Sequence, residues 1–195
     1  MASEINLKGK SVCIFGLKGC GKSNLAATLL DMYGSTALVY DTLSEYPDTA
    51  AYDRYVPANR YNSAELEKIT RAVMRSRRYR LFIIDEANRY CPSKPSPLPQ
   101  AIADLNDWCR HEQYDIVPVY LCRRPTQLNQ DLTEQADYLC IFRLAGVNDV
   151  KYLNELSAGL GDTVRQLSQY HFVMVDQARN YQVMRPVKKA IKSNH

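Results

Sequence analysis

The sequence predicts an α/β fold, with a central, mostly parallel sheet and helices on both of its faces. Two observations predict it: short apolar segments typical of buried strands recur along the chain, and segments with helical apolar spacing lie between several of them. The length of 195 residues fits one domain, 1–195, with a core over roughly residues 8–187 and a short basic C-terminal tail. With 46% hydrophobic and 24% charged residues, the composition is that of a globular protein.

The first third of the chain predicts a strand, a helix and a second strand. Residues 11–15 form a short apolar run that ends at a glycine, as a buried strand does. A helix is expected over 23–33, because its leucines fall at helical spacing and Gly34 follows as a stop signal. A second strand is expected over 36–40. Residues 42–62, rich in Tyr, Asp and Pro, are expected to be mostly irregular.

The rest of the chain continues the alternation. Ser63 is expected to open a helix as its N-cap, with an imperfect capping box, and residues 81–84 form a strongly apolar strand. Four prolines within 92–99 indicate a loop, and a helix is expected over about 100–112. The remaining expected strands are 116–122, in which Pro118 is an irregularity, 138–144, 172–175 and 181–184.

The cysteine pattern and the absence of long apolar stretches point to a reducing cytoplasm. No two of the six cysteines form a CxxC pair, so a zinc site is not expected, and several lie within apolar runs as small hydrophobes. No stretch approaches 18 consecutive apolar residues, so no integral membrane segment is expected. The N-terminus lacks the layout of a secretory signal.

The most specific motif is G-x-x-x-x-G-K-S over residues 16–23. Its glycines let successive backbone N–H groups turn toward phosphate oxygens, and the helix that begins there adds the positive end of its dipole. Lys22 is expected to reach the β- and γ-phosphates of ATP, and Ser23 to place its hydroxyl on Mg²⁺. The expected nucleotide-binding residues are Gly16, Leu17, Lys18, Gly19, Cys20, Gly21, Lys22, Ser23 and Asn24.

Two acids follow the strongly apolar strand at 81–84. In P-loop enzymes an Asp at this place holds Mg²⁺, which is the role expected for Asp85. Glu86 is then placed to orient and deprotonate an attacking water. A base for water favours hydrolysis over phosphate transfer, because a kinase for small molecules must exclude water.

Further segments resemble those of the HerA/FtsK ATPases. They are an apolar strand with an Asp followed by Glu-Tyr, an Arg shortly before a strand, a turn similar to Thr-Gln-Arg-Pro, and the strand after it, at residues 37–46, 108–122, 122–128 and 137–144. The resemblance covers roughly residues 8–187. It implies a P-loop NTPase fold of the ASCE/RecA-like type, a three-layer sandwich around a central sheet.

Within that superfamily the short chain looks most like the genome-packaging ATPases of icosahedral viruses with an internal membrane, both archaeal and bacterial. This resemblance implies self-association into a hexameric ring that uses ATP and Mg²⁺ to drive double-stranded DNA, without sequence specificity, into a preformed capsid. It also implies docking at a capsid or membrane-protein vertex, in the host cytoplasm or on the virion. Zonula-occludens-toxin-like phage assembly ATPases are the second resemblance, although they usually carry a membrane segment.

The resemblance also implies two residue roles. Arg110 matches the position of an arginine finger that completes the neighbouring subunit's site, although an Arg there could instead close a helix C-terminus. The family's sensor glutamine falls on Arg123, so this sequence departs from the pattern. Arg123, Arg124 or Gln127 could take the sensor role.

Three questions stay open at the level of sequence. A nucleotide or nucleoside kinase and a regulatory P-loop switch that barely hydrolyses are the alternative functions, and Glu86 argues against both. The five arginines between residues 71 and 80 could contact nucleic-acid phosphate or form a solvated helix face. The motifs do not distinguish ATP from GTP.

Overall fold

A computed structural model describes residues 6–188; the end of the expected basic C-terminal tail, from residue 189, lies outside the described residues. The centre is an eight-stranded sheet with the strand order β3-β2-β4-β5-β1-β6-β7-β8. Pairing is parallel from β3 to β6 and antiparallel for β6–β7 and β7–β8, which confirms the predicted mostly parallel sheet. The strands are β1 (Val12–Phe15), β2 (Ala37–Tyr40), β3 (Asp53–Tyr55), β4 (Leu81–Ile84), β5 (Val117–Cys122), β6 (Tyr138–Phe142), β7 (Phe172–Val175) and β8 (Tyr181–Met184).

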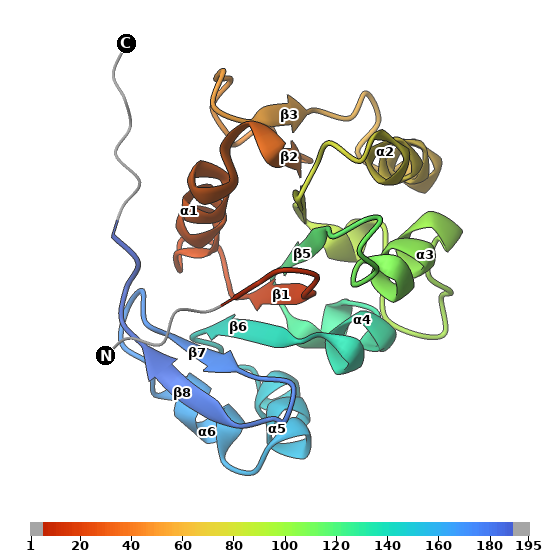
Figure 1. Cartoon of the computed structure of the whole chain (residues 1–195). Helices are drawn as coiled ribbons and strands as arrows, with labels where there is room; N and C mark the ends of the chain where they lie inside the picture. Colours follow the sequence, from red (N-terminus) through yellow and green to blue (C-terminus); the bar gives the residue numbers. More distant parts are fainter. Residues whose placement is uncertain (1–5, 189–195) are drawn as a thin grey trace.

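Helices cover both faces of the sheet, so the molecule has three layers (Figure 1). One face is covered by α1, whose buried residues pack with Val12 and Ile14 of β1. The other face is covered by α2 to α6, whose buried residues pack with Cys13 and Phe15. The helices are α1 (Lys22–Tyr33), α2 (Ser63–Ser76), α3 (Gln100–Trp108), α4 (Gln130–Gln135), α5 (Val147–Leu156) and α6 (Leu160–Arg165), with short 3₁₀ turns η1 (Gly34–Thr36), η2 (Ala87–Arg89) and η3 (Pro125–Gln127).

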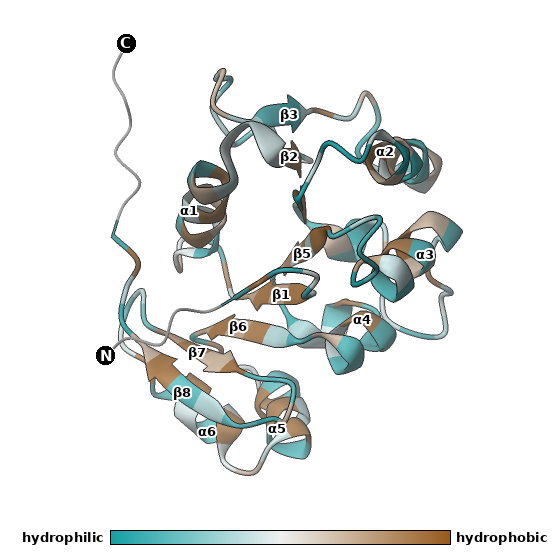
Figure 2. Ribbon diagram, viewed as in Figure 1, coloured by the Kyte–Doolittle hydropathy of each residue, from teal (hydrophilic) through white to brown (hydrophobic). Residues whose placement is uncertain are grey.

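The alternation along β1 explains why the central strands are apolar without a break. Successive side chains of a strand point to opposite faces, and both faces are covered here, so every residue of β1 is buried. Figure 2 shows the same property as hydrophobic colouring of β1, β5 and β6 between the helical layers.

Pro118 lies within β5, a central strand, at a place that tolerates it. Val117 donates its N–H to Arg80 O at 2.8 Å, toward β4, so the nitrogen of the next residue faces β1. The pairing of β1 with β5 begins only at Val12 and Val119. The N–H that proline lacks therefore falls just before that ladder starts.

The region expected to be mostly irregular, 42–62, has regular structure only in the edge strand β3, which the sequence did not predict. The strand pairs in parallel with β2 and is half-buried. Its sequence Asp-Arg-Tyr has no apolar alternation to reveal it. It is held instead by polar contacts, among them Tyr79 Oη donating to Asp53 Oδ2 at 2.6 Å.

The cap of α2 is a correction to the expected one. Asn62, not Ser63, is the N-cap, because its Oδ1 accepts a hydrogen bond from Ala64 N at 3.0 Å. The carboxylate of Glu65 turns away from the helix and accepts from Ala58 N at 2.8 Å. The residue therefore ties the preceding loop to α2 rather than completing a capping box.

The remaining differences concern lengths and missed helices. The helix expected to reach residue 112 ends at Trp108, and the strand expected to reach residue 144 ends at Phe142. Helices α4, α5 and α6 carry no expectation from the sequence. Among residues 6–188, no helix is long and apolar enough to cross a membrane.

Candidate active site

The predicted phosphate loop, the acidic pair and Arg123 meet at one edge of the sheet. They follow β1, β4 and β5, and these three strands are neighbours that run in the same direction. The carboxyl ends of parallel strands share one edge, so segments far apart in sequence come together there. The pocket at this edge is lined by Lys18, Gly19, Gly21, Lys22, Ser23, Asn24, Leu43, Glu45, Asp85, Glu86, Arg123 and Tyr170.

Two glycines allow the loop to lie close to β6. Gly16 has φ 156° and Gly21 has φ 116°, both in the range that favours glycine. A Cβ on Gly16 would lie 2.5 Å from Cys20 Sγ and 2.7 Å from Phe142 Cβ. A Cβ on Gly21 would lie 3.0 Å from Phe142 Cε1. The loop conformation therefore depends on bare backbone at both positions.

The helix α1 begins at Lys22 directly after the loop. Its N-cap is Gly21, which provides no side-chain cap, and Lys22 and Ser23 of its first turn line the pocket, where the positive end of the helix dipole favours an anion. Lys22 Nζ donates to Gly16 O at 2.5 Å and to Leu17 O at 3.2 Å. The ammonium group thus lies against the loop, within reach of a phosphate bound there.

Gly16, Leu17 and Cys20 of the predicted motif support the loop rather than line the pocket. Gly16 N donates to Cys122 O at 3.3 Å, which ties the loop to β5, and Cys20 N donates to Leu17 O at 3.3 Å. The side chain of Leu17 is half-exposed.

Asp85 is a buried carboxylate with a raised pKa. It is 6% exposed, and burial first, with the charge of Glu86 second, raises its pKa to about 7. Its backbone is fixed by Asp85 N donating to Tyr40 O at 3.1 Å and by Thr42 Oγ1 donating to Asp85 O at 2.7 Å. A divalent cation between Asp85 and Ser23 would offset this buried charge, so these residues fit Mg²⁺.

Glu86 lies between two arginines. Arg123 Nε is 3.0 Å from Glu86 Oε1, and Arg89 Nε is 3.8 Å from Glu86 Oε2. The backbone of Glu86 has φ 49°, a left-handed conformation that is costly for a residue with a side chain. Strained residues of this kind concentrate at functional sites, and here the strain turns the carboxylate into the pocket.

The structure distinguishes the three candidates for the sensor position. Only Arg123 lines the pocket. Arg124 Nε pairs with Asp149 Oδ2 of α5 at 3.0 Å, and Gln127 is an exposed residue of η3.

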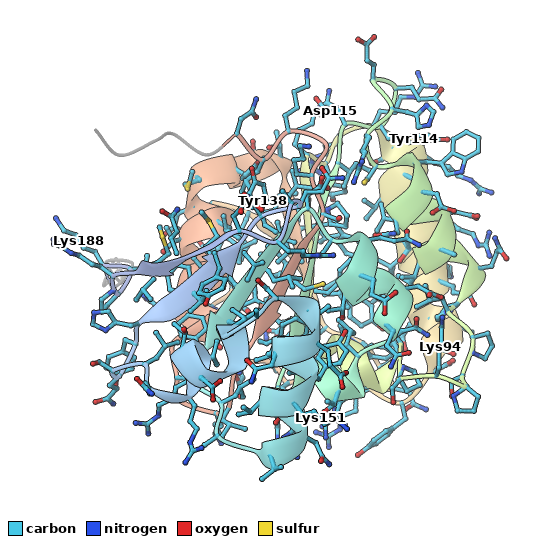
Figure 3. The ribbon with its side chains drawn as sticks, turned by 90° about the horizontal axis from the view of Figure 1, so that it is seen from below. Lys94, Tyr114, Asp115, Tyr138, Lys151 and Lys188 are labelled. Atoms are coloured by element: carbon cyan, nitrogen blue, oxygen red, sulfur yellow. The ribbon has the colours of Figure 1, made fainter. Side chains whose placement is uncertain are left out.

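Arg110 is not part of the pocket. It follows α3 and precedes β5, so it lies at the opposite edge of the sheet, where the parallel strands begin. Its Nη2 is 3.0 Å from Asp137 Oδ1. Figure 3 shows Tyr114, Asp115 and Tyr138 toward this end of the molecule, away from Lys94 and Lys151.

The pocket contains three residues that the sequence did not single out as site residues: Leu43, Glu45 and Tyr170. The first two lie on the loop after β2, which is organised by buried Asp41. Its carboxylate accepts from Glu45 N at 2.9 Å and from Tyr46 N at 3.1 Å, and pairs with Arg54. The Asp at the end of the strand over 36–40 was the available signal for this loop. Nothing in the sequence indicated Tyr170, which lies between α6 and β7 and comes close to Gly21 of the phosphate loop.

Comparison with solved structures identifies the fold. No protein-family model and no curated protein matches the chain. The genome packaging NTPase B204 of Sulfolobus turreted icosahedral virus 2, in complex with ATP-gammaS, superposes with a TM-score of 0.79 at 24% identity, over 94% of this chain and 100% of that chain. The fold is that of a P-loop NTPase.

Two further solved structures share the P-loop ATPase fold. B204, the DNA-packaging ATPase of Sulfolobus turreted icosahedral virus, has a TM-score of 0.80 at 21% identity, covering 93% of this chain and 100% of that chain. The N-terminal domain of zonular occludens toxin from Neisseria meningitidis has a TM-score of only 0.54 at 13% identity, covering 93% and 96%. The coverage is alike in all three, but the TM-scores and identities show that the similarity to the two viral proteins is greater than that to the toxin domain.

Part of the basic cluster at residues 71–80 makes internal contacts. Arg71 pairs with Glu67 on the same helix at 2.9 Å, and Arg78 pairs with Asp53 at 3.0 Å. Arg80 donates to Tyr114 O at 3.0 Å. These contacts favour a structural role for the three residues over one in nucleic-acid binding.

Proposed function

We propose that this chain is an ATP-hydrolysing motor that moves double-stranded viral DNA into a preformed capsid. The observation that carries the proposal is a P-loop with an acidic pair in its pocket, on a chain of which 93–94% superposes on viral genome-packaging ATPases. The weaker superposition on zonular occludens toxin makes a phage assembly ATPase the second candidate.

In the proposed reaction each pocket residue has one task. The N-terminus of α1 and Lys22 bind the phosphates of ATP, and Ser23 and Asp85 hold Mg²⁺. Mg²⁺, when bound, neutralises charge that develops on the phosphates. Glu86 orients a water and accepts its proton. The buried position of Asp85 keeps the metal site shielded, which strengthens these electrostatic contacts.

We further propose that the site is completed by a neighbouring subunit in a hexameric ring. Arg110 and the pocket lie at opposite edges of the same sheet, so Arg110 cannot act on its own subunit's nucleotide. In a head-to-tail ring the edge that carries Arg110 would face the pocket of the next subunit. The arginine would then stabilise charge in the transition state there.

Contacts with DNA are expected to go to the phosphate backbone, as suits a motor without sequence preference. The partner at the capsid or membrane-protein vertex, and a site of action in the host cytoplasm or on the virion, belong to the same proposal. A kinase is disfavoured because Glu86 lies in the pocket, where a kinase for small molecules would exclude water.

The experiment that tests the proposal measures ATPase rate against protein concentration, with and without double-stranded DNA. A ring with a finger in trans should show specific activity that rises with concentration as subunits assemble, and a further increase with DNA of any sequence. A monomeric enzyme gives a constant specific activity. Transfer of phosphate to a nucleoside monophosphate, with no response to DNA, would overturn the motor in favour of a kinase.

A further inference from the structure

The carboxylate of Glu86 lies between arginines from two different elements, and only one of them donates a hydrogen bond to it. Arg123, after β5, contacts Oε1 at 3.0 Å through a hydrogen bond from its Nε. Arg89, at the end of η2, lies 3.8 Å from Oε2. A general base needs a free lone pair for the proton of water, and the contact with Arg123 occupies one.

The two arginines differ in freedom. The side chain of Arg123 is 44% exposed and lines the pocket, so its guanidinium can move. Arg89 is only 25% exposed, and its guanidinium carbon lies 5.5 Å from the centre of the Tyr61 ring, in a cation–π contact. Arg89 is therefore fixed by its surroundings, while Arg123 is able to exchange partners.

A triphosphate in the pocket would compete for Arg123. A terminal phosphate carries more negative charge than a carboxylate and accepts paired hydrogen bonds from a guanidinium. Glu86 is only 12% exposed, but Arg123 is 44% exposed, so water partly screens the pair and the guanidinium can leave Glu86. When Arg123 turns to the phosphate, Oε1 of Glu86 is released, and Arg89 keeps the carboxylate aimed into the pocket.

We propose that Arg123 is a positioning residue that exchanges Glu86 for the terminal phosphate of ATP, and that Arg89 is the fixed positioning residue for Glu86. The inference rests on the proposed hydrolytic function. It adds a way in which this site distinguishes a triphosphate from a diphosphate. Arg123 would thus use its positive charge to detect the terminal phosphate, the task of the sensor glutamine that the family has at this position.

The test compares affinities for ATPγS and ADP, in the presence of Mg²⁺, with kcat and KM for ATP. Arg123→Gln should weaken ATPγS binding about tenfold and leave ADP binding within about twofold, since only the terminal phosphate contacts Arg123. Arg123→Lys should recover part of the loss, because the positive charge remains. Arg89→Gln should lower kcat with both affinities unchanged.

The matched control is Arg71→Gln, measured without DNA. Arg71 pairs with Glu67 at 2.9 Å and is 45% exposed, so the substitution removes an equally exposed arginine from an Arg–Glu pair outside the pocket. It should leave kcat, KM and both affinities unchanged. A general loss of folding caused by Arg123→Gln would weaken ADP binding as well.

A double-mutant cycle separates exchange from simple support. Glu86→Gln removes the carboxylate that competes for Arg123, so ATPγS should bind several-fold more tightly while ADP does not. This gain should disappear in the Glu86→Gln, Arg123→Gln double variant. An unchanged ratio of ATPγS to ADP affinity in Arg123→Gln, or a gain that survives in the double variant, overturns the inference. These binding measurements do not need turnover, so their failure is distinguishable from an absence of ATPase activity.

Discussion

Arg110 Nη2 lies 3.0 Å from Oδ1 of Asp137, a carboxylate that is only 1% exposed. Asp137 also accepts from Ser11 N at 2.9 Å and pairs with Lys10 Nζ at 3.2 Å. The buried carboxylate thus anchors the loop before β5 to the start of β1 and β6. Arg110 itself is half-exposed, and its ion pair with Asp137 anchors it at the edge opposite the pocket.

The first prediction concerns Arg110. Arg110→Ala should lower kcat by about 10³-fold or more, with nucleotide affinity nearly unchanged, because a finger acts on transition-state charge. ATPase assays and equilibrium nucleotide binding measure the two effects. Mixing this variant with Glu86→Gln should restore part of the activity, since some interfaces then combine an intact Glu86 with an intact Arg110.

The control for Arg110 is Lys10→Ala. Lys10 contacts the same carboxylate, so this substitution tests whether loss of charge beside Asp137 is enough to reduce activity. Equal loss of activity in both variants, or no recovery on mixing, would show that Arg110 only stabilises the fold.

The second prediction concerns Glu86. Glu86→Gln keeps the size of the side chain and removes the base, so ATP should still bind while turnover falls at least 10²-fold, roughly the contribution of general-base catalysis. Single-turnover hydrolysis together with binding of ATPγS measures both properties. Hydrolysis near the normal rate would exclude Glu86 as the base.

The third prediction compares two glycines of the phosphate loop. Gly16→Ala should destabilise the protein by roughly 2–4 kcal/mol, from the contacts of its Cβ with Cys20 and Phe142 and from its backbone conformation. Gly19 also has positive φ, 78°, but its Cβ would meet no atom within 4 Å among the described residues. Gly19→Ala should therefore cost only about 1–2 kcal/mol.

Urea unfolding of the two alanine variants measures this difference. Equal destabilisation would show that backbone conformation, and not the close packing against Phe142, makes Gly16 necessary.

The fourth prediction is a pH dependence of stability caused by Asp85. Its pKa is raised to about 7 in the folded protein, above the value of the unfolded chain, so the folded state keeps a proton that the unfolded state has lost. The free energy of unfolding therefore falls as pH rises from about 4 to about 7 because of this group, by at most about 4 kcal/mol. Asp85→Asn removes this cost.

The measurement is unfolding of both proteins in EDTA at pH 5 and pH 8. Asp85→Asn should exceed the original protein in stability by more at pH 8 than at pH 5. An equal difference at the two values would mean that the Asp85 carboxylate is not significantly desolvated in the folded state.

Much of the core and of the phosphate site follows from local sequence. The strands β1, β4 and β5 are apolar throughout because both faces of the sheet are covered, and this makes them recognisable. The motif at residues 16–23 and the acids after β4 are recognisable because each residue type has a chemical task that tolerates few substitutes. The mostly parallel sheet followed from the alternation of such strands with helical segments.

Tertiary structure decided what depends on contacts between distant segments. β3 is held by Tyr79 and Arg54 rather than by an apolar pattern, so only its pairing with β2 reveals it. Only the fold shows that Arg123, among the three sensor candidates, lies beside Glu86, because this contact joins the ends of β4 and β5. The sequence determines which residue types follow each strand. The order of the strands in the sheet decides which of these residues meet, because side chains interact only over a few ångströms.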